Sequence, residues 1–167
     1  YEVPRIAFVN KMDRNGADFY NVLDMLGQRL GSNFVPVQLP IGTGETFTGL
    51  IDLVGMKSVT YEEGSHGVRF FVDEIPDDLV EKAMEYREKL LEAVAEFDDG
   101  LLEKFLDGHD ISPDEIEAAL RQATIALTAV PVVCGSAFRH KGVQRLLDAV
   151  VKYLPSPADV PEVTGLL

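Results

Sequence analysis

The sequence predicts an α/β fold built on a partial, doubly wound parallel β-sheet. Two short, continuously apolar segments, residues 6–9 and 130–133, are typical of strands that are covered on both faces. A helical pattern over residues 17–30 and an extended segment over residues 35–41 follow the first strand, which gives the β-α-β order of such a sheet. Ligands of these sheets bind beyond the carboxyl ends of the strands, so we expect the functional residues there.

The first helix and the strand after it carry clear boundary signals. Asp18 is expected in the first turn of the helix, where a negative charge suits the helix dipole, and Gly31 is expected to end it. The strand over residues 35–41 contains two prolines, which favour the edge of a sheet or an irregular position. Residues 42–44 are predicted to form a turn, because the phosphate-loop pattern Gly-x-x-x-x-Gly-Lys-Ser/Thr occurs nowhere in the chain.

The middle of the chain predicts a group of short strands followed by an amphipathic helix. Residues 50–54, 56–61 and 68–72 are expected to be strands, separated by turns that contain glycine. The helix is expected over residues 79–97. Its apolar stripe comprises Leu79, Val80, Ala83, Met84, Leu90, Leu91, Val94 and Phe97.

Three more helices are expected before the end of the chain. A short one covers residues 101–106. Residues 112–115 form a capping box with Pro113 at the first helical position, which predicts a helix that runs to about Leu127. The last helix, over residues 143–154, follows the second buried strand.

Composition bounds the class of protein. The chain has 167 residues, of which 46% are hydrophobic, so it can bury a core as one domain, or as one domain with a large insertion. It has no apolar run of membrane-spanning length and no signal-like start, which predicts a soluble cytoplasmic protein. The single cysteine, Cys134, excludes an intramolecular disulfide, and its apolar neighbours indicate a packed thiol.

The net charge of −13 belongs to one internal segment. Residues 73–117 contain 17 acidic and 4 basic residues, whereas the rest of the chain has 11 of each. Phosphate backbones would be repelled by this segment, so we expect no direct contact with nucleic acid there. Two interpretations remain open, a solvated face that aids solubility and a docking surface for a basic partner.

The first buried strand ends in the pattern Asn-Lys-x-Asp. Guanine presents N1–H and an exocyclic amine side by side, and one ionised carboxylate such as Asp13 can accept from both. The amide of Asn10 can bond the base edge or brace the loop, and the apolar stem of Lys11 can lie across a base face. The second buried strand ends in the small residues Ser136 and Ala137, which let backbone N–H groups approach a ligand closely.

These two strand ends resemble the base-binding motifs of GTP-binding domains, and the resemblance extends further. The stretches PRIAFVNKMDRNGADF, QLPIGTGETFTGLIDLV and VVCGSAFRHKGVQRLLDAVVKYLPSPADVP, together with their separation, resemble bacterial elongation factor G from about Pro4 to the last residue. The resemblance implies a P-loop GTPase-type sheet, of which residues 1–46 and 130–155 would be the C-terminal half. Residues 47–129 would be an inserted α+β subdomain, and residues 156–167 a linker towards the next domain.

The resemblance also implies roles for five residues. In that family the residue at Asp13 binds the guanine ring nitrogens, Asn10 contacts the base and its loop, and Lys11 stacks over the base. Ser136 and Ala137 would back the base oxygen. The ligand would be GTP or GDP, with Mg²⁺ in the intact protein, and no residue of this chain is expected to be catalytic or to bind a metal.

The intact protein implied by the resemblance is a GTPase that drives tRNA and mRNA movement on the ribosome and helps to recycle ribosomes. Residues 73–117 would contact the ribosomal stalk protein, whose docking face is basic in this family. The phosphate-loop pattern is missing from the sequence, and by the family pattern the phosphate loop, the magnesium-binding residues and the DxxG-type switch would lie before Tyr1. We therefore expect a fragment that does not hydrolyse GTP alone.

Two alternative functions are disfavoured by the sequence. A ribosome-protection protein or a release factor of similar build is disfavoured by the match at YLPSPADVP. A nucleotide-free acidic adaptor on a partial GTPase fold is disfavoured by the presence of both base-binding loops, which an adaptor would not need.

Overall fold

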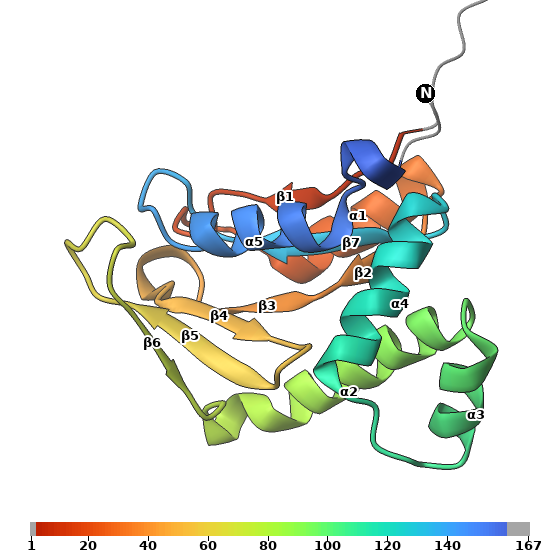
Figure 1. Ribbon diagram of the computed structural model, residues 1–167. Helices are drawn as coiled ribbons and strands as arrows, with labels where there is room; N and C mark the ends of the chain where they lie inside the picture. Colours follow the sequence, from red (N-terminus) through yellow and green to blue (C-terminus); the bar gives the residue numbers. More distant parts are fainter. Residues whose placement is uncertain (1–2, 160–167) are drawn as a thin grey trace, which may run out of the picture.

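The computed structural model describes residues 3–159 and contains two β-sheets, one above the other in the view of Figure 1, with helices around them. The parallel sheet has the order β1-β7-β2 and comprises Ala7–Val9 (β1), Phe34–Pro36 (β2) and Val130–Cys134 (β7). The antiparallel sheet has the order β3-β4-β5-β6 and comprises Gln38–Ile41 (β3), Gly49–Asp52 (β4), Lys57–Tyr61 (β5) and Phe70–Asp73 (β6). The predicted α/β fold with an additional α+β part is confirmed.

Five helices complete the described part of the chain. They are Phe19–Leu30 (α1), Asp77–Ala95 (α2), Asp99–Leu106 (α3), Pro113–Ile125 (α4) and Val143–Tyr153 (α5), and short 3-10 turns occur at Gly44–Thr46 (η1) and Pro157–Asp159 (η2). Helix α5 lies in front of β7 in Figure 1 and α1 lies behind it, so both faces of the parallel sheet are covered. Among residues 3–159, no helix is both long enough and apolar enough to span a bilayer.

Helix α1 begins one residue after Asp18, which is its N-cap rather than part of its first turn. The Asp18 side chain accepts a hydrogen bond from the Asn21 N–H at 3.0 Å, which satisfies one of the free donors at the helix start. Gly31 ends the helix as predicted, with a left-handed φ of 61°. Phe19, at the first helical position, is fully buried.

The prediction of one strand over residues 35–41 was wrong, because this segment changes sheet at Val37. The Val37 N–H donates to the Val132 carbonyl at 3.0 Å, and the Val37 carbonyl accepts from the Leu53 N–H at 3.0 Å. Pro36 and Pro40 have no N–H to donate, which suits the outermost strand of each sheet. The predicted edge position is therefore confirmed for both β2 and β3.

The apolar stripe predicted along helix α2 is only partly correct. Ala83, Leu90 and Val94 are buried, but Met84 is 61% exposed and Phe97 lies beyond the helix end, 37% exposed. The buried face contains Arg87 instead, whose guanidinium donates to the carbonyl groups at the β4–β5 turn. A long apolar stem with a satisfied polar end can occupy a core-facing position, which a count of apolar residues does not detect.

The capping box at the start of α4 is confirmed. The Ser112 Oγ accepts from the Glu115 N–H at 3.3 Å, and the Glu115 carboxylate accepts from the Ser112 N–H at 3.0 Å. The helix ends at Ile125, before the predicted end at Leu127, because Leu127 itself has a left-handed φ of 65°.

Strand β7 is the best-buried strand of the parallel sheet, and Cys134 at its end is a buried free thiol, as predicted. Burial raises the pKa of this thiol. The predicted linker over residues 156–167 is described only as far as residue 159, where η2 follows α5, and its remainder lies outside the described residues. The division of the chain at residues 46 and 130 stays a prediction.

Candidate functional site

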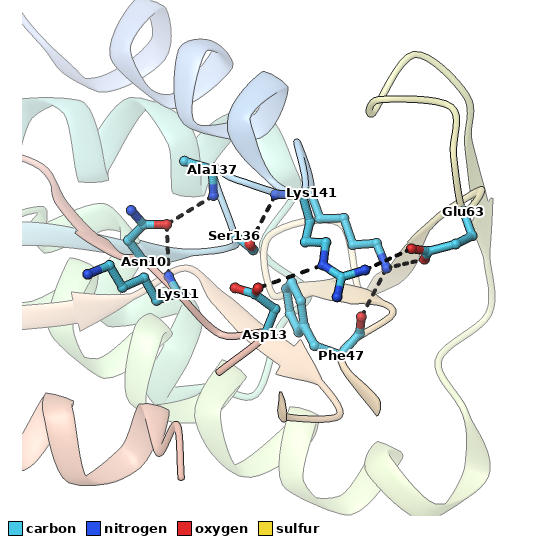
Figure 2. Close-up of polar contacts among 9 residues, drawn as sticks. Asn10, Lys11, Asp13, Phe47, Glu63, Ser136, Ala137 and Lys141 are labelled. Carbon is cyan, nitrogen blue, oxygen red and sulfur yellow. Dashed lines mark hydrogen bonds and ion pairs between the residues drawn. The ribbon is translucent and has the colours of Figure 1, made fainter. Parts of the chain in front are cut away.

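The two predicted loops meet at one end of the parallel sheet. Val9 and Cys134, the last residues of β1 and β7, are paired in register, so the segments after them emerge side by side. Figure 2 shows Asn10, Lys11 and Asp13 from the first segment close to Ser136 and Ala137 from the second. The structure therefore brings the five predicted residues into one neighbourhood.

Asn10 joins the two loops directly. Its side-chain oxygen accepts from the Lys11 N–H at 2.8 Å and from the Ala137 N–H at 2.9 Å (Figure 2). Backbone bonds reinforce this junction, since the Met12 N–H donates to the Gly135 carbonyl at 3.1 Å. The Asn10 amide was predicted either to bond the base edge or to brace the loop, and the structure shows it bracing the loop.

Lys11 has the backbone conformation of a constrained loop residue. Its φ is 64°, in the left-handed region that costs a non-glycine residue about 1 kcal/mol or more. The residue is exposed, and its side chain extends away from Asp13 in Figure 2. Met12, next along the chain, is buried and anchors the loop in the core.

Ser136 and Ala137 open a tight turn over residues 136–141. The Ser136 N–H donates to the Lys141 carbonyl at 2.8 Å, and the Lys141 N–H donates to the Ser136 carbonyl at 3.0 Å. Ser136 is fully buried, and its Oγ accepts from the Arg139 N–H at 3.3 Å. Because Asn10 already accepts from the Ala137 N–H, a base oxygen at this point would share that proton or displace the amide.

Asp13 lies at the edge of a polar hollow. Its side chain is 15% exposed, and one carboxylate oxygen is 3.8 Å from the Arg139 Nε. The hollow has a volume of about 270 Å³ and is lined by Asp13, Gly44, Glu45, Phe47, Glu63, Arg139 and Lys141. A partly exposed carboxylate beside a hollow of this size can accept hydrogen bonds from a planar ligand edge.

Four charged residues of this hollow, Glu45, Glu63, Arg139 and Lys141, were not predicted as site residues, and three of them form a network. Glu63 accepts from the Arg139 guanidinium at 3.1 Å and from the Lys141 ammonium at 2.9 Å, and Lys141 also donates to the Phe47 carbonyl at 3.1 Å (Figure 2). The Lys141 side chain is 9% exposed, and its hydrogen bond and charge lower the pKa of the Glu63 carboxyl. The basic turn after Ala137 was visible in the sequence, but Glu63 is distant in sequence and had no local signal.

The donor set of this site does not suit a metal ion. Within residues 3–159, no group of three or more His, Cys, Asp or Glu side chains is placed to hold one. Two carboxylates of the hollow, Asp13 and Glu63, instead face the basic side chains of Arg139 and Lys141.

Two comparisons place the chain among known proteins. The family model described as elongation factor Tu GTP binding domain matches residues 1–156. The structure is similar to a crystal structure from Thermus thermophilus, with a TM-score of 0.80 and 35% sequence identity. That likeness covers 93% of this chain and 23% of the other, so the chain spans about a quarter of the length of the protein that it matches.

Proposed function

The chain belongs to the elongation factor Tu GTP-binding domain family, and from this premise we propose that it is the base-binding half of a ribosomal translocation GTPase of the elongation factor G type. The family consists of GTP-binding domains of translation factors, which supports guanine-nucleotide binding by the intact protein. In this proposal the intact protein works in the cytoplasm and couples GTP hydrolysis to tRNA and mRNA movement on the ribosome.

The observation that carries the proposal is the junction made by Asn10. Its two hydrogen bonds hold the Asp13 loop against the Ala137 turn, so that Asp13 lies close to the small residues Ser136 and Ala137 (Figure 2). In this arrangement Asp13 accepts from both N–H groups of a guanine edge, and the Lys11 stem covers the base face. Ser136 and Ala137 lie behind the base oxygen.

The five proposed base-binding residues do not bind the phosphate groups of the nucleotide. The sequence contains no phosphate-loop pattern, and the described residues contain no metal-binding cluster. The triphosphate and Mg²⁺ of GTP therefore need other parts of the intact protein, and we propose that the 167 residues alone do not hydrolyse GTP. Turnover that persists through repeated purification of the 167-residue chain would contradict this.

The test of the base site is a nucleotide competition. Asp13→Asn in the full-length protein should weaken GDP binding and strengthen xanthosine diphosphate binding, because the amide both accepts from N1–H and donates to the 2-oxo group of xanthine. A nucleotide-free acidic adaptor, the second candidate function, would bind neither nucleotide in either variant. Unchanged preference for GDP would remove Asp13 from the base site.

A second part of the proposal concerns the acidic segment, residues 73–117, as a docking surface for the basic face of the ribosomal stalk protein. Helix α2 carries Glu81, Glu85 and Glu88 on its exposed surface. Like charges in such a row favour a cationic partner and steer its approach. The segment contains 17 acidic and 4 basic residues, which supports a partner that binds through charge.

The docking surface is tested by replacing Glu81, Glu85 and Glu88 with glutamine in the full-length protein. Binding to the purified stalk protein, measured by titration calorimetry at rising salt, should weaken and lose part of its salt dependence. The matched control replaces three exposed acidic residues outside the segment. These are Asp24, Glu62 and Asp148. Equal weakening in both variants would indicate a net-charge effect and reject a localised docking surface.

A further inference from the structure

The hairpin formed by β5 and β6 reaches the Ala137 turn from a distant part of the sequence. The Gln144 side chain donates to the Gly67 carbonyl at 2.8 Å, and the rings of His66 and His140 meet edge to face with centroids 5.4 Å apart. Figure 2 shows Glu63, from the same hairpin, directed at the basic side chains of the turn. The hairpin therefore touches the loop that lies behind the proposed base site.

Arg139 lies between two carboxylates. One guanidinium nitrogen is 3.1 Å from Glu63, and another is 3.8 Å from Asp13. The first distance is a hydrogen bond and the second is a longer ion pair, so Glu63 holds the guanidinium more closely than Asp13 does. Lys141 adds a second positive charge to the hollow, and Glu45 adds a further negative one.

The choice of the Arg139 guanidinium between Glu63 and Asp13 determines whether Asp13 can bind a ligand. A guanidinium binds a carboxylate through two parallel N–H···O bonds when nothing competes, and such a pair would occupy both Asp13 oxygens. Those are the oxygens that a guanine edge needs. Because the Arg139 side chain is 50% exposed, it has room to turn toward Asp13 if its other partner is removed.

We propose that Glu63 is a positioning residue for base recognition, which holds Arg139 and Lys141 so that the Asp13 carboxylate stays free to accept both N–H groups of guanine. This inference rests on the proposed role of Asp13. It assigns a function in nucleotide specificity to a residue of the inserted hairpin. A glutamate is ionised at neutral pH at its ordinary pKa, and the hydrogen bond and charge of Lys141 lower the pKa of Glu63 further, so its negative charge is present at that pH.

The experiment compares GDP with inosine diphosphate in the full-length protein. Inosine lacks the exocyclic amine, so the ratio of the two dissociation constants reports how well Asp13 accepts from that amine. Glu63→Gln should lower the preference for GDP over inosine diphosphate roughly tenfold, the value of one charge-assisted hydrogen bond. The double variant Glu63→Gln/Arg139→Gln should restore the preference, because no guanidinium then captures Asp13.

The matched control is Glu62→Gln, which lies next to Glu63 in the hairpin but pairs with Arg69 at 3.4 Å. It should leave the preference unchanged. If Glu63→Gln weakens both nucleotides equally, or if the double variant fails to restore the preference, the contact is merely structural and the inference is overturned. The Asp13→Asn variant distinguishes the proposed base site from the proposed role of Glu63. If this variant prefers xanthosine diphosphate, the base site is supported even when Glu63→Gln has no effect on the preference. Without that shift, the base site and this inference both fail.

Discussion

Asn10 and Asp13 belong to the same four-residue motif, yet they act on different partners. Asn10 acts within the protein, because its side-chain oxygen accepts two backbone hydrogen bonds. Within residues 3–159 the Asp13 side chain has no comparable backbone bond, and it stands at the hollow 3.8 Å from the Arg139 Nε. Substitution of Asn10 should therefore affect the shape of the site, whereas substitution of Asp13 should affect its chemistry.

Asn10→Ala should loosen both loops together. The variant loses the bonds to the N–H groups of Lys11 and Ala137, and we expect the free energy of unfolding to fall by about 1 kcal/mol. Urea denaturation measures this loss, and GDP affinity in the full-length protein should fall with it. Asn15→Ala, in the same loop but beyond the motif, provides a comparison. A variant with normal loops and normal nucleotide affinity would show that the brace is dispensable.

The motif residues could be found from the sequence because their chemistry is local. Four consecutive residues after a buried strand were enough to predict Asn10 and Asp13 at a ligand edge, although their roles in base binding stay a prediction. Glu63 could not be found in this way. Its contacts with Arg139 and Lys141 depend on how a hairpin folds back across 76 and 78 residues, which no local pattern records.

At the level of elements, the tip of the β5–β6 hairpin depends on Gly67. Its φ is 76°, and a Cβ at this position would lie 2.2 Å from the His140 carbonyl oxygen. Gly67→Ala should therefore push the hairpin away from the Ala137 turn. Hydrogen exchange of the amides at residues 64–67 and 138–141 should become faster in this variant.

Gly64 provides the control for this effect. It has a similar φ of 78°, but a Cβ there would meet nothing within 4 Å. Gly64→Ala thus carries the same backbone strain without the collision, and exchange at residues 138–141 should stay as in the natural protein. Equal acceleration in both variants would mean that strain within the hairpin, rather than its contact with the turn, controls the exchange.

Glu115, at the start of helix α4, should make the folding stability depend on pH in the acidic range. Hydrogen bonds from Lys104 and Ser112 lower the pKa of Glu115 from 4.5 to about 2. A carboxyl whose pKa is lower in the folded state than in the unfolded state stabilises the protein when the pH is above the unfolded-state pKa. This contribution is lost as the pH falls through the folded-state pKa. The contribution of Glu115 should thus be complete above about pH 5 and should disappear toward pH 2.

The measurement is the melting temperature of the natural protein and of Glu115→Gln between pH 2 and 6. The difference between the two should be largest near pH 6 and should shrink on acidification, because glutamine has no proton to gain. Other carboxyls with lowered pKa values, such as Glu63 and Asp159, are present in both proteins and cancel in the difference. A difference that is constant with pH would assign no acid-dependent role to Glu115.

At the level of the whole molecule, the sequence predicted the classes of element better than their connections. Helix α4 was found because residues 112–115 form a complete local capping box. The change of sheet at Val37 was missed, because both halves of that segment are extended and apolar and differ only in their partners. Local propensity decides whether a residue is extended, but it does not decide which strand it pairs with.

The parallel sheet has an open edge at β1, and this leads to a prediction about the full-length protein. Within residues 3–159, β1 pairs with β7 on one side and with no strand on the other. Parallel sheets are normally covered, and an unpaired edge strand invites another strand. If the chain is half of a larger GTPase sheet, as proposed, the full-length protein should supply that strand.

Hydrogen exchange compares the 167-residue chain with the full-length protein at two strands. The N–H groups of β1 that face the open edge should exchange slowly in the full-length protein and quickly in the shorter chain, since a strand partner protects them only in the former. The amides of β7 lie between β1 and β2 in both proteins, so their protection serves as the reference for global stability. Equal protection of β1 in the two proteins, with β7 unchanged, would mean that no strand is added at this edge, and the half-sheet interpretation would be wrong.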